Sequence, residues 1–282
     1  MSKSRGYVFI HGAWHSSGTW AEIKPRLERQ GHLVRAVDLP GAGPNASEPA
    51  SLTRRPFDKD AFATEPSPNA DVTQRERTDA VIAAVREINS QTGGKAILVG
   101  HSLGGLTVSH VAEEIPEEIG AVVYLTAMML PSGMSALEVS KRDALPDEML
   151  PSLICANPNT VGAMRLNTRS EDPAYRARMK ECFYGDVDQE TFDRVAKGLH
   201  CDEPAVVRME PSPMTAGNFG TVPRHYIECT EDNAIPIYRQ RFMIAAVDAA
   251  LGSKTTVHTL RCSHSPFASI PDDLGGILLN IR

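Results

Sequence analysis

A serine set between glycines, where an apolar run meets a helical segment, constrains this chain more than any other feature. Residues 98–105 read Leu-Val-Gly-His-Ser-Leu-Gly-Gly, which places Ser102 in a Gly-x-Ser-x-Gly pattern. The apolar run 96–99 predicts a short buried strand, and residues 103–114 predict the helix that follows it. A turn so tight needs glycines because a Cβ there would collide with neighbouring backbone. The pattern therefore predicts a nucleophilic serine pushed out of a sheet; an ordinary glycine-rich turn with a surface serine is the alternative.

Size, charge and cysteine content narrow the class of protein. The chain has 282 residues, 41% of them hydrophobic, which suffices for one large α/β domain or two small ones. Its net charge of -6 argues against nucleic acid or an anionic membrane as a partner. We expect no membrane span, since no apolar stretch reaches the roughly 20 residues needed, and no signal peptide, since the opening residues lead straight into a strand. Five scattered cysteines predict reduced thiols in a cytoplasmic protein, with neither a disulfide framework nor a metal site.

Predicted strands and helices alternate along most of the chain. This alternation predicts an α/β fold, a doubly wound and mainly parallel sheet with helices on both faces. Residues 44–72 carry no clear period and are interpreted as a long surface excursion. The predicted strands are 7–10, 33–37, 96–99, 120–125, 224–229 and 255–260, and the predicted helices between and after them are 19–29, 73–90, 103–114, 236–250 and 271–280.

The alternation breaks off after the fourth predicted strand. Residues 128–213 hold several prolines and only short helical fragments, at 173–182 and 189–197. We therefore predict a core made of residues 1–127 and 214–282, with a helical cap of residues 128–213 inserted into it. The cap should cover the carboxyl ends of the strands, where open α/β sheets bind ligands.

A serine hydroxyl is a weak nucleophile, so it needs a base, and the base needs an orienting acid. His264 lies in a loop just past the last predicted strand, where a base could reach Ser102, and we expect it to be that base. The loop 230–236 follows the strand 224–229 and offers both Glu231 and Asp232. We prefer Asp232 as the acid. The other downstream histidines lie in the cap, on the following helix or inside strands: His110, His200, His225 and His258.

Backbone amides should hold the negative oxygen that develops during attack on a carbonyl. We expect the N–H of Leu103, at the helix start, and the N–H of Ala13, after the first strand, to form this oxyanion hole. Gly12 would let the second loop approach closely. The expected substrate-binding residues, for which packing is the alternative role, are Trp14, His101, Met128 and Met129.

These stretches resemble the α/β-hydrolase superfamily, and within it the small branch of plant methylesterases, hydroxynitrile lyases and bacterial pyrethroid-type esterases. The resemblance implies a six-stranded, mainly parallel sheet, a helical cap, no cofactor, and Asp232 as the acid of a Ser-His-Asp triad. The matching stretches are Phe9-Ile10-His11-Gly12-Ala13-Trp14, Asp38-Leu39-Pro40-Gly41, Val99-Gly100-His101-Ser102-Leu103-Gly104-Gly105, Thr230-Glu231-Asp232-Asn233-Ala234-Ile235-Pro236 and Ser263-His264-Ser265-Pro266.

Two departures from this branch bear on the chemistry. Its lyases carry a threonine after the first-strand histidine and a lysine after the catalytic histidine, where this chain has Gly12 and Ser265. These differences disfavour cyanide chemistry. The excursion 44–72 is also longer than in these relatives, so the shape of the pocket does not carry over.

The sequence therefore predicts a serine hydrolase of the carboxylesterase type. It should cleave a carboxylic ester of a small, largely hydrophobic substrate through an acyl-enzyme at Ser102, with no cofactor. The alternatives are a lyase on the same triad, a lactone or amide hydrolase, and a ligand-binding receptor. The expected partner is a small-molecule ester, with no nucleic acid and no membrane. The sequence leaves the oligomeric state open and is compatible with a homodimer.

Overall fold

A single parallel sheet organises the molecule. The computed structural model describes residues 4–142 and 149–281; residues 143–148 of the predicted cap lie outside the described part. The sheet has six strands in the order β2-β1-β3-β4-β7-β8, and every neighbouring pair is parallel. The strands are β1 (Gly6–Ile10), β2 (Leu33–Val37), β3 (Ala96–His101), β4 (Ile119–Leu125), β7 (Arg224–Cys229) and β8 (Thr256–Leu260). The predicted fold class is therefore confirmed.

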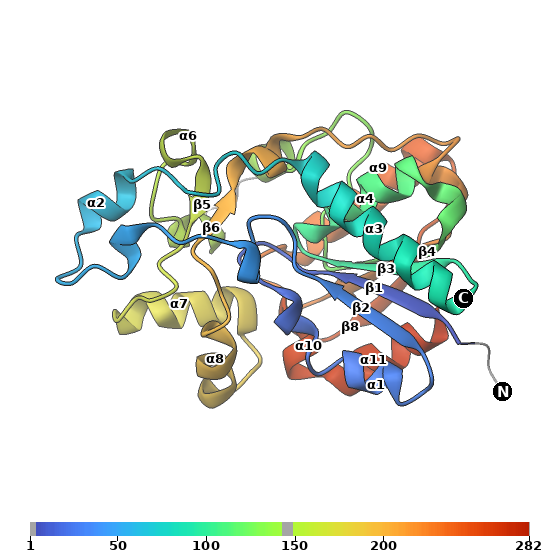
Figure 1. Cartoon of the computed structure of the whole chain (residues 1–282), viewed down its shortest axis with the longest axis horizontal. Coiled ribbons are helices and arrows are strands. Elements are labelled where there is room, and N and C mark those ends of the chain that lie inside the picture. Colours follow the sequence, from blue (N-terminus) through green and yellow to red (C-terminus); the bar gives the residue numbers. More distant parts are fainter. Residues whose placement is uncertain (1–3, 143–148, 282) are drawn as a thin grey trace.

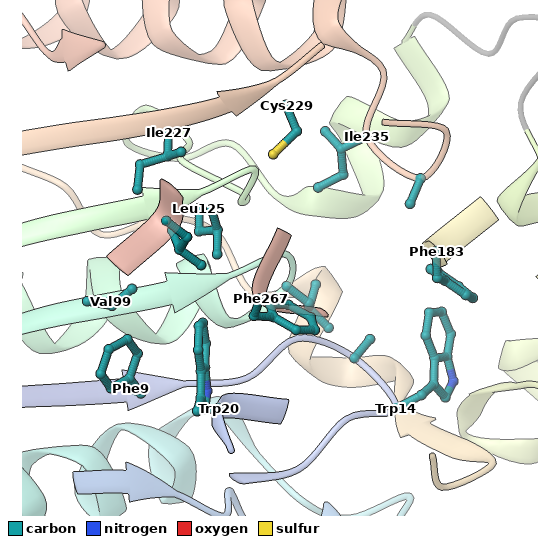
Figure 2. Close-up of a cluster of buried hydrophobic side chains, with 14 of the residues drawn as sticks. Phe9, Trp14, Trp20, Val99, Leu125, Phe183, Ile227, Cys229, Ile235 and Phe267 are labelled. Carbon is teal, nitrogen blue, oxygen red and sulfur yellow. The ribbon is translucent and has the colours of Figure 1, made fainter. Parts of the chain in front are cut away.

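Helices cover both faces of this sheet (Figure 1). Alternate residues of β1 show why: Tyr7 and Phe9 belong to the hydrophobic core of one face, whereas Val8 and Ile10 belong to that of the other. Figure 2 shows the first of these cores, where Phe9, Trp20 and Phe267 meet under the sheet. One face carries α3 (Gln74–Thr92), α4 (Gly104–Glu114) and α9 (Ile237–Leu251), and the other carries α1 (Lys24–Glu28), α10 (Pro266–Ser269) and α11 (Pro271–Asn280).

Local sequence signals set several helix ends. Thr73 begins α3 with a capping box, in which its side chain accepts from Glu76 N and its own amide donates to Glu76. Gly93 ends the same helix in the left-handed conformation. The predicted helix 19–29 is instead split into a short 3₁₀ turn (Ser17–Trp20) and α1, whose first turn contains Pro25.

Between β4 and β7 the chain leaves the sheet and returns. This region lies at the carboxyl ends of the strands, at one end of the molecule (Figure 1). The extent of the predicted cap, 128–213, stays a prediction. The elements between β4 and β7 are α5 (Ala136–Arg142), α6 (Pro158–Val161), β5 (Ala163–Arg165), α7 (Pro173–Tyr184), α8 (Gln189–Ala196), β6 (Asp202–Pro204) and the 3₁₀ turns η5 (Leu150–Leu153), η6 (Ala205–Met209) and η7 (Phe219–Thr221), the last of which lies beyond the predicted cap.

The excursion 44–72 is more ordered than its sequence suggests. It contains two 3₁₀ turns, η2 (Gly43–Asn45) and η3 (Ala50–Leu52), and the helix α2 (Lys59–Thr64). Leu52 and Phe62 form a small core with Cys201. Arg165 of β5 donates hydrogen bonds to the carbonyls of Phe62 and Glu65, which ties the excursion to the region after β4. No helix of the described ranges is long and apolar enough to cross a membrane.

Candidate active site

Ser102 lies on the turn between β3 and α4. Its backbone φ is 54°, in the left-handed region that disfavours residues with a side chain. Its carbonyl accepts hydrogen bonds from Met128 N at 2.9 Å and Gly105 N at 3.2 Å, which hold the turn against the end of β4. Backbone strain of this kind persists only where the surroundings fix it. The half-buried side chain lines a cavity.

The glycines beside this serine are required by close packing. A Cβ on Gly100 would lie 2.5 Å from a methyl carbon of Val108. A Cβ on Gly104 would overlap the carbonyl oxygen of His11 at the end of β1. Neither neighbour is the free end of a flexible side chain. The spacing of glycines that we took from the sequence therefore has a direct steric cause.

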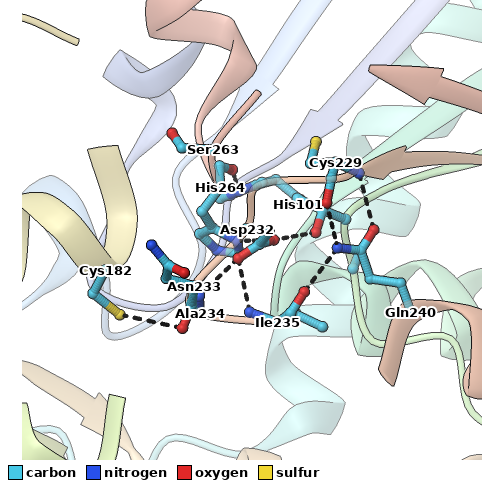
Figure 3. A network of polar contacts seen from close by, with 12 residues as sticks. His101, Cys182, Cys229, Asp232, Asn233, Ala234, Ile235, Gln240, Ser263 and His264 are labelled. Atoms are coloured by element: carbon cyan, nitrogen blue, oxygen red, sulfur yellow. Dashed lines mark hydrogen bonds and ion pairs between the residues drawn. The ribbon is translucent and has the colours of Figure 1, made fainter. Parts of the chain in front are cut away.

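Asp232 and His264 meet although they are far apart in the sequence. His264 Nδ1 lies 2.7 Å from Asp232 Oδ2, and both side chains are buried (Figure 3). Asp232 comes from the loop after β7, and His264 comes from the loop after β8. Because the strands are parallel and adjacent, their carboxyl ends bring these loops to one edge of the sheet.

Further hydrogen bonds fix the carboxylate of Asp232. Its Oδ1 accepts from the backbone N–H groups of Ala234 at 2.7 Å and Ile235 at 2.8 Å. Its Oδ2 also accepts from the hydroxyl of Thr126, at the end of β4. A carboxylate with this many donors is held in one orientation, so its bond to the imidazole is directional.

Aromatic rings surround His264. The ring of His101 lies 4.5 Å from it between centroids, and that of Phe183 lies 6.1 Å away. His101 Nε2 lies 2.9 Å from the carbonyl oxygen of His264, so it donates a hydrogen bond to the loop that carries this residue. Since His101 precedes Ser102, this bond joins the serine turn to the histidine loop.

The loop after β1 lies close to the serine. A Cβ on Gly12 would lie 2.7 Å from Ser102 Cβ. Among the described residues, no acceptor is hydrogen-bonded to the amide of Ala13 or of Leu103. Both residues line the cavity beside Ser102. These two amides are therefore available to an oxygen that enters the cavity.

Residues after β4 hold the loop that contains Ala13. Trp14 Nε1 donates to Met164 O at 2.8 Å, and the amide of His200 donates to Trp14 O at 3.0 Å. Trp14 itself has a φ of 60°, another strained position at this edge. Residues between β4 and β7 thus contribute to the geometry of the first-strand loop.

The cavity beside Ser102 has a volume of about 360 Å³, within the ~300–1,000 Å³ that is usual for small-molecule sites. Most of its walls are apolar, and Trp14 and Met128 line it as predicted. The other apolar lining residues are Ala13, Leu103, Ala136, Leu150, Pro151, Ile154, Met164, Phe183, Ala234 and Ile235.

Two predicted substrate-binding residues lie elsewhere and are corrected here. His101 is fully buried beneath the His264 loop, and Met129 is fully buried in the core on the α3 and α4 side of the sheet. Neither lines the cavity. Adjacent residues of an extended chain point to opposite sides, so Met128 faces the cavity while Met129 does not.

Several residues that shape the site escaped the sequence analysis. Gln240, fully buried on α9, clamps the start of the acid loop: it accepts from Cys229 N and donates to the carbonyls of Cys229 and Ile235 (Figure 3). Asp186 accepts from the amide of Ser263 at 3.0 Å and from its hydroxyl. Thr126 could have been found, because it ends the strand next to β7 and therefore shares the edge with Asp232.

The chemistry available at this edge is that of nucleophilic catalysis. The structure brings together a strained serine, an imidazole bonded to a buried carboxylate, and unbonded amides around a cavity. Over residues 4–142 and 149–281, no three His, Cys, Asp or Glu side chains are grouped to hold a metal ion. The fold and this arrangement define an α/β enzyme of the hydrolase class with a serine at its nucleophile turn.

A match to a family model agrees with this class. Residues 7–274 match the alpha/beta hydrolase family, so the chain belongs to that family. The chain is 28% identical to the pyrethroid hydrolase of Sphingobium wenxiniae over 268 residues, covering 95% of this chain and 84% of the relative. It is 26% identical to the putative chloroplastic methylesterase 11 of Arabidopsis thaliana, covering 98% of this chain but only 63% of that longer protein.

Solved structures show the same fold. The crystal structure of a pyrethroid hydrolase from Sphingobium faniae JZ-2 aligns with a TM-score of 0.73 at 24% identity, covering 98% of this chain and 96% of that one. The relatives named above, a pyrethroid hydrolase and a methylesterase, support a carboxylesterase-type hydrolase activity for this chain.

Proposed function

We propose that this chain hydrolyses carboxylic esters of small, largely hydrophobic substrates through a covalent ester on Ser102. The observation that carries the proposal is the bond between His264 Nδ1 and the buried Asp232, at the same sheet edge as the strained serine. The mainly apolar cavity supports a hydrophobic acyl or alcohol group. The names of the relatives, a pyrethroid hydrolase and a methylesterase, support an ester as the substrate.

The reaction proceeds in two halves. His264 accepts the proton of Ser102 as the hydroxyl oxygen attacks the ester carbonyl, and the amides of Ala13 and Leu103 stabilise the resulting oxyanion. His264 then gives its proton to the leaving alcohol, which leaves an acyl group on Ser102. Water, deprotonated by His264, then attacks this acyl group; the bond from the acyl carbon to Ser102 Oγ breaks, the acid is released, and His264 returns the proton to Ser102. Asp232 stabilises the positive imidazole during both halves.

A serine variant tests this assignment. Ser102→Ala should lower kcat/KM for 4-nitrophenyl esters by at least about 10³-fold, because no nucleophile remains. The matched control is Ser90→Ala, an exposed serine on α3, which should keep full activity. A fluorophosphonate probe should form one adduct, mapped to Ser102 by mass spectrometry. Activity retained in Ser102→Ala, or an adduct on another residue, would overturn the proposal.

The same assay distinguishes the substrate class. A series of 4-nitrophenyl esters of rising chain length, run beside aryl amides and lactones, should show turnover of the esters. Preferred turnover of an amide or lactone would move the function to that class. The expected cytoplasmic location also stays a proposal, supported by the five cysteines, all of which are free thiols.

A further inference from the structure

The cavity beside Ser102 is mainly apolar, and the charged residues described in its wall are all basic. Lys141, Arg208 and Arg239 all line it, and none of the described residues in its wall is an aspartate or a glutamate. A cation in a mainly apolar wall is unusual in a site that binds only neutral hydrophobic esters, because such a wall does not compensate its charge.

Arg208 is the most informative of these residues. Its side chain is half-buried, and its Nη1 lies 2.8 Å from the sulfur of Met164, a weak acceptor that carries no charge. No carboxylate of the described chain forms an ion pair with it. Burial lowers the pKa of Arg208, as expected for a cation held partly out of water without a counter-charge.

Two other buried arginines of this chain, unlike Arg208, form ion pairs with carboxylates. Arg77 lies 2.5 Å from Glu203, and Arg165 lies 2.7 Å from Asp202. Each of these carboxylates is fully buried with its arginine. Each of these two arginines therefore has a buried counter-charge, whereas Arg208 lines the cavity and has none among residues 4–142 and 149–281.

The position of Arg208 is fixed by the surrounding elements. It lies on η6 (Ala205–Met209), which follows β6 directly and packs against α5 (Ala136–Arg142). The ion pair of Glu203 with Arg77 ties β6 to α3 of the core. Lys141 lies on α5, so the packing of these elements brings a second cation to the same cavity.

We infer that the ester substrate carries a second, anionic group, a carboxylate, which binds Arg208 while the ester carbonyl lies at Ser102. The inference rests on the proposed esterase function and specifies its substrate class. A guanidinium offers a planar fork of donors that fits a carboxylate in two parallel hydrogen bonds. The apolar walls would contact the carbon chain between the two groups, and Lys141 would add attraction without a fixed geometry.

Matched ester pairs test the inference on either side of the ester. On the acyl side, 4-nitrophenyl valerate is compared with 4-nitrophenyl hemiglutarate, in which a carboxylate replaces the terminal methyl group. On the alcohol side, 4-methylphenyl butyrate is compared with 4-(butyryloxy)benzoate. We expect kcat/KM to favour the anionic ester by at least about tenfold in one of the pairs, as for a hydrogen-bonded charge pair. The pair that shows this preference identifies the side that carries the carboxylate.

Variants of Arg208 then assign the preference to this residue. Arg208→Met should lower the anionic-to-neutral ratio of kcat/KM by at least about tenfold, and Arg208→Lys should restore part of it. Arg29→Met, at an exposed arginine outside the cavity, is the control and should leave the ratio unchanged. A ratio near one in both pairs for the unaltered protein, or a ratio that Arg208→Met does not change, would overturn the inference.

Two further measurements distinguish three outcomes: a variant that misfolds, a chain that is not an esterase, and an esterase that has no anion site at Arg208. The rate of fluorophosphonate labelling reports whether the Arg208 variants keep an intact serine site. Binding of glutarate to Ser102→Ala, compared with the double variant that adds Arg208→Met, tests the anion site without turnover. If no ester is hydrolysed and no adduct forms, the proposed function fails; if all esters are hydrolysed without an anionic preference, only the inference fails.

Discussion

At the scale of single residues, the hydrogen bonds of Asp232 decide which nitrogen of His264 is free. A carboxylate only accepts, so the proton between the two residues belongs to Nδ1 of the imidazole. Nε2 of the neutral ring is then an acceptor, which is the form that a general base requires. The hydroxyl of Thr126 and the amides of Ala234 and Ile235 hold the carboxylate in this orientation. The tautomer therefore follows from the fold.

Gly12 offers a sharp test of the oxyanion loop. A methyl group in Gly12→Ala would lie 2.7 Å from Ser102 Cβ and 2.9 Å from His101 Nδ1, so the loop must shift away from the serine. We expect kcat to fall by about 10²–10³-fold with a much smaller change in KM, the effect of a displaced oxyanion donor. Steady-state kinetics on a 4-nitrophenyl ester measures both values.

The control for this variant is Gly276→Ala on α11. A Cβ there meets nothing within 4 Å, and the position is helical, so the change should leave kcat unaltered. Equal activity of the two variants would mean that the loop after β1 takes no part in catalysis.

For single residues, the sequence predicts the positions that follow from a local motif or from the order of the strands. Ser102 and His264 follow parallel strands of one sheet, so their position at the same sheet edge could be anticipated. The place of Arg208 in the cavity wall could not be anticipated, because no local pattern shows which arginine has no carboxylate partner among the described residues. The burial of His101 and Met129 was also missed, since a side chain near the nucleophile can point into the core.

At the scale of elements, α7 connects the catalytic loops. Asn233, next to Asp232, donates to the carbonyl and the carboxylate of Glu181 at the end of this helix. The hydroxyl of Tyr184 lies 2.7 Å from His15 Nε2, in the loop after β1. Asp186, just past the helix, accepts from Ser263 beside His264. One helix of the predicted cap thus contacts the loops of the acid, the base and the oxyanion hole.

The contact between Asp186 and Ser263 can be tested by a single substitution. In Asp186→Asn the side-chain oxygen can still accept from the amide of Ser263, but the bond to the hydroxyl survives only if it reverses, with the asparagine NH2 group as donor, and both bonds lose the carboxylate charge. We expect kcat/KM for the ester to fall by about tenfold as the His264 loop loosens, with a loss of about 1–2 kcal/mol in the free energy of unfolding. Kinetics and urea denaturation of the same preparation measure the two effects.

Asp188→Asn provides the matched control. It makes the same change of charge two positions along the chain, where Asp188 accepts from Thr191 N as the N-cap of α8. Its effect should be confined to stability, because asparagine is also a good N-cap and α8 carries no catalytic loop. If both variants lost activity equally, charge and not the Ser263 contact would be the cause.

Element prediction from the sequence succeeded where periodicity is local. The predicted helix 73–90, observed as α3, and the predicted strand 96–99, observed within β3, are examples. It failed for α2 and for the 3₁₀ turns of residues 44–72, because their order depends on Arg165, about a hundred positions later. A contact of that kind leaves no trace in the local pattern.

At the scale of the whole molecule, buried charges join its parts. Arg77 with Glu203 links α3 to β6, and Arg165 with Asp202 links β5 to β6 while it also holds the excursion 44–72. Burial opposes the ionised form of Glu203, but Arg77 and a hydrogen bond with His200 outweigh it and lower the pKa of Glu203 to about 2. This link should therefore persist throughout the mildly acidic range.

The buried histidines, unlike the ion pair of Glu203, destabilise the fold in the mildly acidic range. Burial lowers the pKa of His11 from 6.5 to about 3 and that of His15 to about 4. Between about pH 6.5 and pH 4 the unfolded chain therefore binds protons at these residues that the native protein does not bind. Stability rises with pH wherever the unfolded state holds more protons, so acidification through this window must destabilise the fold.

We expect the free energy of unfolding to fall between pH 6.5 and pH 5, and His15 to account for up to about 1.4 kcal/mol per pH unit of that slope. Urea denaturation at closely spaced pH values measures the slope directly.

In His15→Gln the slope of stability against pH should become shallower, because one titrating group has been removed from the unfolded chain. His258→Gln, at a partly exposed strand position, should change the slope less. Glu203 cannot produce this slope, since a carboxyl whose pKa is lowered from 4.5 loses its contribution only below about pH 4.5. A stability that stayed level from pH 6.5 to pH 5 would mean that the buried histidines take up protons in the native state, with the loop after β1 opening to water as they do so.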